Sequence, residues 1–569
     1  MDAAHPEAFV ILEKDLTKPA TDTKTSLRPF TSQDQGSIAN GTFGGPIDLD
    51  DVILRANGHE SAMQRQFSWM SALGLGFSIT NSWVGYLSNF GQNLVYGGPQ
   101  SCLFGLLAAF VAQFIISLGL SEIASAFPSS GGQYHFCYIM APANTRRFTG
   151  YLVGWMSTLA WWIVTCSGTS LFAATLSGMI GFWHPAFEGT QWQIYLIYCA
   201  TATITMLPVV FSSKRITLIV QTSLYSSLIG FFIVLLVSAG MHKHTMPASF
   251  IVHSGLGSSG WSPSVAWILG ITNAMYAFGG TDGAIHISEE TSQPGRRVPQ
   301  VMMLTILIGL GTAFPLFLAL MFFMTDLNAV TSARLPSLEL INQASVPPWS
   351  YIREQHLMNF TRTGNDDVTL FLFAYILLIY LVCIPSQWVT GGRLAWAFAR
   401  DYGVPFSGYF SKIDEKRKLP LRATIASYTF ACLYGLLYLA STTAFNSIVT
   451  SAVLFLNITY VVPQGILLVQ GRNNSLPPRY LNLGWFGYIC NMFSVLWIVV
   501  LGAFICMPPI LPVTAGSMNY TSVVLVGLLS IVLLFWVLDG RKNFKGPNID
   551  WDMIKALNSA GTATEGHRD

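Results

Sequence analysis

Long stretches without a charged residue alternate with short charged segments over most of this chain. No Asp, Glu, Lys or Arg lies between Arg65 and Glu122, and the stretch from Arg422 to Arg472 is long enough for two membrane spans. A helix needs about 20 mostly apolar residues to cross a hydrocarbon core about 30 Å thick. The pattern therefore predicts a series of membrane-spanning helices.

Division of these stretches at turn-forming residues predicts twelve helices, and so an all-α membrane protein. The predicted spans are residues 70–90, 100–123, 150–176, 192–210, 215–239, 264–287, 300–324, 368–391, 421–440, 445–469, 486–507 and 518–538. Residues 1–65 and 541–569 are polar and lack helical periodicity. We predict a disordered N-terminal tail and a short C-terminal tail on either side of a helical domain at 66–540.

The predicted sixth helix is interrupted near its middle. The segment from Trp261 to Thr281 carries no charge, yet it contains Gly279 and Gly280 near its end, and Asp282 and Gly283 follow it directly. Each glycine in a helix interior costs about 1 kcal/mol relative to alanine. Non-helical backbone at membrane depth is tolerated where protein or a water-filled cavity satisfies it. The segment therefore predicts a broken helix beside a solute site.

The predicted first helix has a polar patch, Ser78-Ile79-Thr80-Asn81-Ser82, in the middle of an apolar span. The first and sixth helices stand five apart, so each begins a five-helix half. Inverted repeats whose first helices are both broken place a solute at the midplane, where the ends of half-helices face it. The predicted fold is thus a 5+5 inverted repeat, with two further helices at the C-terminal end.

Composition and charge agree with this interpretation. Only 10% of the residues are charged, 52% are hydrophobic and the mean hydropathy is +0.48, whereas soluble domains carry about 25% charged residues. If both termini are cytoplasmic, 26 of the 30 lysines and arginines lie on the cytoplasmic side, as basic residues prefer. The net charge of +2 is spread over loops, so the predicted surroundings are a lipid bilayer and no nucleic acid.

Several motifs resemble those of a known group of proteins. Tyr276, Phe278, Gly280 and Asp282 fit the aromatic-x-aromatic-x-Gly-x-acid pattern of the amino acid–polyamine–organocation superfamily. Further motifs are similar to the fungal amino acid/choline transporter family, which includes GABA permeases and choline permeases. These motifs are Phe77–Trp83, Gly97–Pro99, Ser121–Pro128, Gly131–Tyr134, His286–Thr291 and Pro294–Pro299.

This resemblance implies a permease of the plasma membrane that carries an amino acid, GABA or a choline-like amine by alternating access, coupled to protons. It implies no enzyme activity, no cofactor and no metal. Amino-acid-specific relatives bind the substrate carboxylate with a Gly-Ser-Gly pattern in helix one. Thr80, Asn81 and Ser82 stand there instead, which weakens the case for an α-amino acid. A nutrient sensor with the same fold and a carrier of a secondary-metabolite precursor or product stay open.

The candidate solute-binding residues lie on four helices. A carboxylate within a span costs about 3 kcal/mol on insertion scales, so Asp282 is expected to attract a cationic solute, to carry a coupling proton or to cap the second half of its helix. Aromatic rings can hold a cationic amine by cation–π attraction or simply pack. The candidates are Thr80, Asn81, Ser82, Trp161, Tyr276, Phe278, Gly279, Gly280, Asp282 and Gln387.

Two further kinds of site are predicted in the loops. Glu122, Glu289 and Glu290 stand at predicted cytoplasmic helix ends, where they could form an inner gate with Arg65 or with loop arginines, or simply be solvated. Asn359-Phe360-Thr361, in the long external loop, is an N-glycosylation acceptor sequence.

Overall fold

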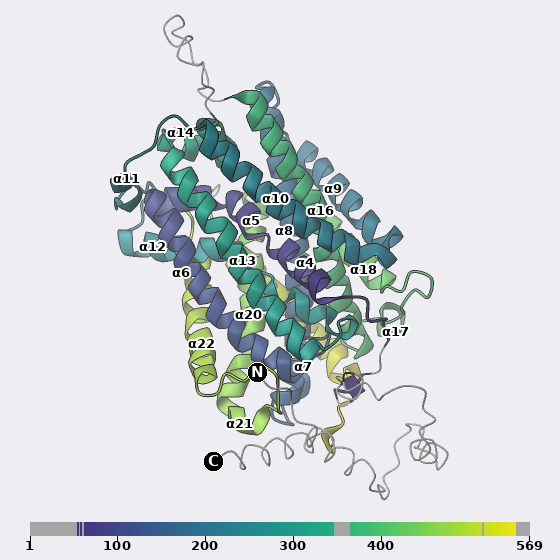
Figure 1. Ribbon diagram of the computed structural model, residues 1–569. Coiled ribbons are helices and arrows are strands. Elements are labelled where there is room, and N and C mark those ends of the chain that lie inside the picture. Colours follow the sequence, from purple (N-terminus) through teal and green to yellow (C-terminus); the bar gives the residue numbers. More distant parts are fainter. Residues whose placement is uncertain are drawn as a thin grey trace, which may run out of the picture.

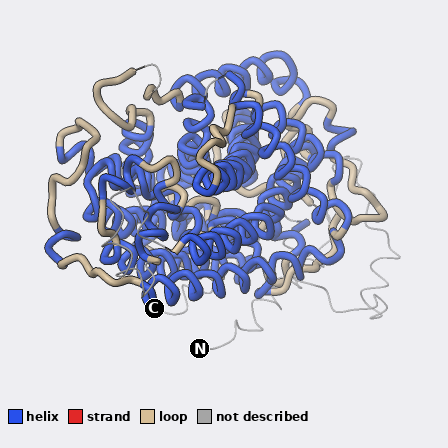
Figure 2. Tube along the Cα trace, turned by 90° about the horizontal axis from the view of Figure 1, so that it is seen from above, coloured by secondary structure: helices blue, strands red, loops and turns tan. Residues whose placement is uncertain are grey.

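The computed structural model describes residues 62–345, 365–440, 442–514 and 517–552, together with residues 50, 54–55 and 57–59. The described residues form helices and connecting loops, with two isolated bridges and no longer strand (Figure 2). The predicted all-α fold is confirmed. The glycosylation candidate Asn359 lies outside the described residues, so its modification stays a prediction.

Twelve spanning segments follow one another along the chain (Figure 1). In order they are α4 (Trp69–Thr80) with α5 (Ser82–Leu87), α6 (Phe90–Ala126), α8 (Arg146–Trp183), α9 (Gln191–Phe211), α10 (Ile216–Met241), α12 (Pro263–Ala274) with η2 (Met275–Phe278) and η3 (Thr281–Glu290), α13 (Pro294–Phe323), α16 (Asp366–Arg400), α18 (Leu421–Gly435) with α19 (Leu437–Ala440), α20 (Thr442–Gln470), α22 (Phe486–Ile505) and α23 (Thr521–Phe535).

Among the described residues, 9 helices are long and apolar enough to cross a membrane alone. The remaining three spans are the first, the sixth and the ninth, and each is divided into shorter pieces. The first and sixth are the two helices for which the sequence predicts breaks. Helices five apart also pack against each other, because α6 contacts α13, α8 contacts α16 and α9 contacts α18.

The second span consists of two helical pieces. Helix α6 starts at Phe90, and Gly97 and Gly98 have non-helical backbone angles at a kink just before Pro99. Gly98 has φ 68°, a conformation that residues with a side chain rarely adopt. The glycines therefore interrupt the helix next to the boundary predicted at residue 100, and the piece that starts at Phe90 is helical where the sequence predicts a connection.

Short helices mark the two ends of the bundle. We call the end with residues 57–59, 62–68 and 541–552 the terminal end; it carries α7 (Gln133–Met140), α17 (Ser407–Phe410), α21 (Arg472–Ser475) and α24 (Arg541–Asn543). The opposite end, here the loop end, carries α11 (Ala248–Val252), α14 (Leu327–Ser332) and α15 (Pro336–Ala344).

Parts of both predicted tails pack against the terminal end. Asn57, His59 and Met63 are buried, and His135 of α7 places its Nε2 atom 2.9 Å from the carbonyl oxygen of Asn57. Beyond the last span, Phe544 is buried and its carbonyl accepts a hydrogen bond from Arg147. The domain boundaries at residues 65 and 541 stay predictions.

Candidate functional site

The first spanning helix is interrupted at Asn81. This residue lies between α4 and α5 with φ 32° and ψ 56°, in the left-handed region, which asparagine tolerates better than most residues. Its side chain ties the break to two other helices. The Oδ1 atom accepts a 2.7 Å hydrogen bond from Ser227 of α10, and Nδ2 lies 3.5 Å from the sulfur of Cys383 on α16.

The sixth helix is interrupted at the predicted glycines. α12 ends at Ala274 and the chain tightens into η2, then Gly279 is extended and Gly280 has φ 78° before η3 begins. A Cβ atom on Gly280 would also lie 2.8 Å from the side chain of Ile79. Glycine is thus required both by the backbone conformation and by the close approach of helix one.

The two breaks meet at a central cavity of about 60 Å³. Of the predicted residues, Thr80, Asn81, Tyr276, Gly279 and Gln387 line it. The described lining contains no Asp, Glu, Lys or Arg. The sequence-based prediction of a solute site at two breaks therefore has a cavity in the expected place, but one without a formal charge.

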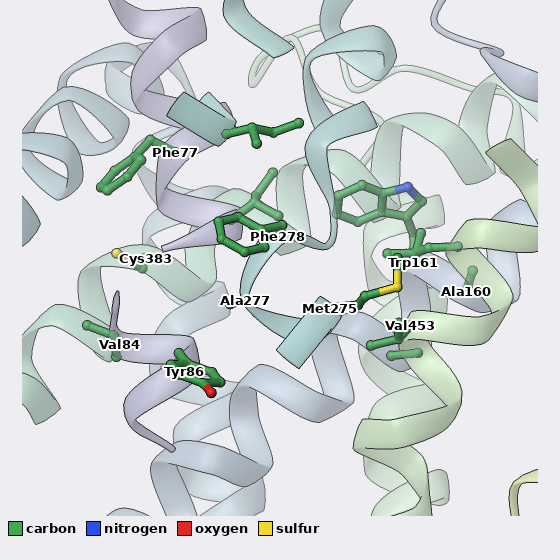
Figure 3. Packing of buried hydrophobic residues seen from close by; sticks show 14 of the residues in the cluster. Phe77, Val84, Tyr86, Ala160, Trp161, Met275, Ala277, Phe278, Cys383 and Val453 are labelled. Carbon is green, nitrogen blue, oxygen red and sulfur yellow. The ribbon is translucent and has the colours of Figure 1, made fainter. Parts of the chain in front are cut away.

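The other predicted residues lie outside the lining. Ser82 faces α13, where its Oγ atom would be 2.2 Å from a Cβ on Gly309. Phe278 packs in the core with its ring centroid 5.7 Å from that of Phe110. Figure 3 shows Phe278 and Trp161 on opposite sides of the chain that joins η2 to η3. For these residues, as for Gly280, direct solute contact stays a prediction.

Asp282 is fully buried and also lies outside the cavity lining. Its carboxylate accepts hydrogen bonds from Gln133 Nε2 at 2.6 Å, from Trp161 Nε1 at 3.1 Å and from the hydroxyl of Tyr460. His286 Nε2 lies 3.2 Å away. The side chain thus turns away from the central cavity into a closed polar cluster.

Sequence reasoning missed several lining residues. Some lie three or four residues apart on one face of α8 or α16. Counted from the predicted Gln387, this helical spacing could have identified the lining residues of α16. Others, on α20, are apolar and carry no chemical signal. The missed residues include Ser78, Val164, Ser167, Gly168, Leu171, Tyr380, Cys383, Ala452, Val453 and Leu456.

Buried ion pairs join the helices at the terminal end. The three glutamates singled out from the sequence each bind arginine from another part of the chain. The pairs are Glu122 with Arg472 and Arg479, Glu289 with Arg400, and Glu290 with Arg393. The ion pair of Arg65 that the structure shows is with Asp50, at 3.9 Å. A gating role for these residues stays a prediction.

A second, larger cavity of about 430 Å³ lies toward the loop end. Amide side chains line it, among them Asn89, Gln92, Asn273 and Asn519. Leu171 lines both cavities. The hydroxyls of Ser88, at the larger cavity, and Tyr380, at the central one, are hydrogen-bonded to each other. The larger cavity, here called the vestibule, thus adjoins the central cavity at Leu171 and at the Ser88–Tyr380 hydroxyl pair.

Twelve spans, two of them broken around a buried cavity, define a membrane permease. Comparison with known proteins agrees: the model of the family described as "Amino acid permease" matches residues 67–529. The chain belongs to this family. It is 33% identical to the choline transporter of Saccharomyces cerevisiae over 502 residues, which are 87% of this chain and 85% of the relative.

Two other relatives widen the range of solutes. A transmembrane transporter, swnT, of Metarhizium robertsii is 28% identical over 85% of this chain and 92% of its own length. The amino-acid permease BAT1 of Arabidopsis thaliana is 24% identical over 89% of this chain and 98% of its own length. The predicted class, a multi-pass permease of small nitrogenous solutes rather than an enzyme, is confirmed by the family and these relatives.

Proposed function

We propose that this permease carries a small amine of the choline type by alternating access and couples its movement to protons. The observation that supports this substrate class is the cavity at the two breaks, whose described lining holds no charged side chain. The proposed location is the plasma membrane with both termini in the cytoplasm, on the strength of the distribution of lysines and arginines.

The backbone around the cavity favours a cation. Both α4 and α12 run toward the breaks and end there, at Thr80 and Ala274, while α5 and η3 begin there, at Ser82 and Thr281. The C-terminal end of a helix carries partial negative charge and the N-terminal end partial positive charge, each equivalent to about half an elementary charge. The ends of α4 and α12 can therefore attract the positively charged group of a solute without a carboxylate in contact with it.

Side chains of the lining suit a choline-like molecule at both of its ends. Tyr276 and Tyr380 offer ring faces for a quaternary ammonium group, which cannot donate hydrogen bonds. Gln387 has a buried Oε1 atom with no hydrogen-bond partner in the described structure. An unpaired buried acceptor is costly, and the hydroxyl of the solute can satisfy it.

An α-amino acid fits this lining less well. Its carboxylate would enter a cavity whose described walls offer neither arginine nor lysine. The 33% identity to a choline transporter points the same way. A carrier of a secondary-metabolite precursor or product is the second candidate; the 26% identity to the swainsonine transporter swnT of Arthroderma benhamiae, over 88% of this chain, supports a solute other than choline. GABA and a sensing role rest on the sequence motifs alone.

Uptake by yeast that lacks its own choline and amino acid permeases tests the substrate. Labelled choline is expected to accumulate, and excess unlabelled choline to compete with it. The neutral isostere 3,3-dimethylbutan-1-ol should not compete, because it has the shape without the charge. Equal competition by the isostere, or stronger competition by alanine or GABA, would contradict the proposal.

A pair of variants at Tyr276 sharpens this test. Tyr276→Leu removes the ring and is expected to weaken choline binding by about 10-fold, from a cation–π contribution of about 1–2 kcal/mol. Tyr276→Phe keeps the ring and loses the 2.7 Å hydrogen bond to Ser167, so it should stay closer to the parent. Both are compared at equal surface expression.

A further inference from the structure

Asp282 and His286 form a buried pair one turn apart on η3. The Nε2 atom of His286 lies 3.2 Å from Oδ2 of Asp282, and the side chains are 0% and 1% exposed. On the other side of the ring, Nδ1 lies 3.0 Å from the backbone carbonyl oxygen of Ser130, in the loop before α7. The imidazole therefore bridges the broken helix and a loop of the terminal end.

The two contacts of His286 require a shared proton. A carbonyl oxygen only accepts hydrogen bonds, so the Nδ1 atom beside Ser130 must carry hydrogen. In a neutral ring, Nε2 would then present its lone pair to Asp282. A carboxylate oxygen and a lone pair repel each other unless a proton lies between them. The pair thus holds one proton in addition to the hydrogen on Nδ1.

The neighbours of Asp282 decide which atom carries that proton. The carboxylate accepts hydrogen bonds from Gln133, Trp161 and Tyr460. Hydrogen bonds donated to a carboxylate favour its charged form. These donors therefore favour the position of the shared proton on the Nε2 side of the contact with His286.

Other titratable groups around η3 have partners or are neutral. On η3 itself, Glu289 and Glu290 are paired with arginines of α16. Burial lowers the pKa of His135, on α7, to about 4, so this imidazole is neutral. Two tyrosines of neighbouring elements donate to carboxylates: Tyr134 of α7 to Asp401, and Tyr460 of α20 to Asp282. Glu122 of α6 is paired with Arg472 and Arg479. On α13, Arg296 lies over the ring of Tyr480, and Arg297 donates to Ser292.

We propose that Asp282 and His286 together bind the coupling proton, and that the solute touches neither of them. The inference rests on the proposed proton coupling and assigns it to a pair. With the proton bound, His286 holds η3 to the loop at Ser130. This loop is also tied to η3 by the Ser130 N–H, which donates to Glu289 at 3.1 Å.

Loss of the proton has a mechanical consequence. If it leaves from Nε2, the lone pair there faces the carboxylate of Asp282. If the Nδ1 hydrogen leaves instead, a lone pair faces the carbonyl of Ser130. Either way the ring loses one of its two contacts, and the pair gains a net charge of −1 in a buried place, which is costly. Deprotonation therefore loosens η3 from the terminal-end loop.

The side chains of Ile79 and Trp161 connect this pair to the wall of the cavity. Ile79 lines the cavity, and its Cδ1 atom would lie 2.6 Å from a Cβ on Gly283, the residue after Asp282. Trp161, which donates to Asp282, packs against Gly280 and Gly283 as well. A movement of η3 on deprotonation would therefore displace the wall of the cavity, although the solute does not contact the carboxylate.

The test uses the purified full chain in proteoliposomes and two assays of labelled choline. Counterflow exchange at equal pH needs binding and alternating access but no net proton movement. Accumulation driven by a pH gradient needs coupling as well. His286→Gln and Asp282→Asn are each expected to keep counterflow within about threefold of the parent and to lose accumulation by at least tenfold.

Asp401→Asn is the matched control. Burial raises the pKa of Asp401 to about 6, so this carboxyl also titrates near neutral pH, but it lies at the terminal end beyond α16. The control should keep both activities. Wild-type accumulation by His286→Gln, or loss of counterflow together with accumulation in both pair variants, would overturn the assignment. If the parent accumulates choline without a pH gradient and ignores a protonophore, the coupling itself is wrong.

Discussion

The two ends of this bundle are closed by different kinds of interaction. At the terminal end, Glu122, Glu289 and Glu290 are buried and paired with arginines from other helices. At the loop end, a cavity of about 430 Å³ shares the lining residue Leu171 with the central cavity, and Ser88 and Tyr380 of the two linings are hydrogen-bonded to each other. Buried ion pairs thus characterise the terminal end, and a larger cavity lined by polar side chains characterises the loop end.

The comparison of the two ends shows where the charged side chains of this permease lie. Charged side chains hold the terminal end together and, in the Asp282–His286 pair, lie just beyond the cavity wall. The described lining of the cavity itself is uncharged. A net hydrogen bond is worth about 1 kcal/mol, whereas removal of one partner of a buried ion pair costs about 3–5 kcal/mol. We expect opening of the terminal end to be the more costly step.

The largest effect is expected from breaking one of the buried ion pairs. Arg393→Ala leaves Glu290 charged and buried, and should lower the free energy of unfolding by about 3–5 kcal/mol. Thermal unfolding of the purified protein in detergent measures this. In the control Arg417→Ala, the lost pair with Asp414 is partly exposed, at 39% and 25%, so little change in the free energy of unfolding is expected. Similar losses in both variants would mean that burial does not strengthen the ion pairs of the terminal end.

A smaller effect is expected at the break of helix six. Gly280→Ala forces a side chain into φ 78° and toward Ile79, at a cost of about 1–2 kcal/mol from the backbone alone. Gly279→Ala is matched to it, because Gly279 has φ −74° and the nearest atom would lie 3.7 Å from the new Cβ. Melting temperatures should fall for the first and change little for the second. A tolerated alanine at Gly280 would contradict the described break.

The smallest effect is expected at the hydroxyl pair of the loop end. Ser88→Ala breaks the hydrogen bond to Tyr380 without changing the described lining of the central cavity. It should speed solute entry from the vestibule by at most about fivefold, equal to about 1 kcal/mol. Counterflow rates measure it. The double variant Tyr380→Phe with Ser88→Ala should increase the entry rate little beyond Ser88→Ala alone. If the effects of the two single variants on this rate add up fully, the two hydroxyls act separately.

Much of the fold could be predicted from the sequence because it depends on long-range composition. Charge-free stretches determine the number of spans, and glycines beside polar residues mark where helices one and six break. The helix bounds were less accurate before Gly97-Gly98, since the chain is already helical from Phe90, where a connection was predicted.

The orientation of side chains at the site could not be predicted in the same way. Beyond Gly279 and Gly280 the chain forms the tighter helix η3, so a rotation of 100° per residue no longer tells where Asp282 points. Val453, on α20, is apolar and gives no chemical signal that it lines a cavity. The arginine partners of the glutamates follow from tertiary packing, which no local pattern records.

The central claim is that the solute binds in the uncharged cavity and that Asp282 stays out of contact with it. Equilibrium binding of labelled choline to two purified variants tests this directly. Gly168→Val puts a side chain into the lining, where its Cβ would lie 2.5 Å from Gln387 Oε1, and should abolish binding. Asp282→Asn should keep the dissociation constant within about threefold of the parent. A large loss of affinity in Asp282→Asn, with binding retained in Gly168→Val, would contradict the account.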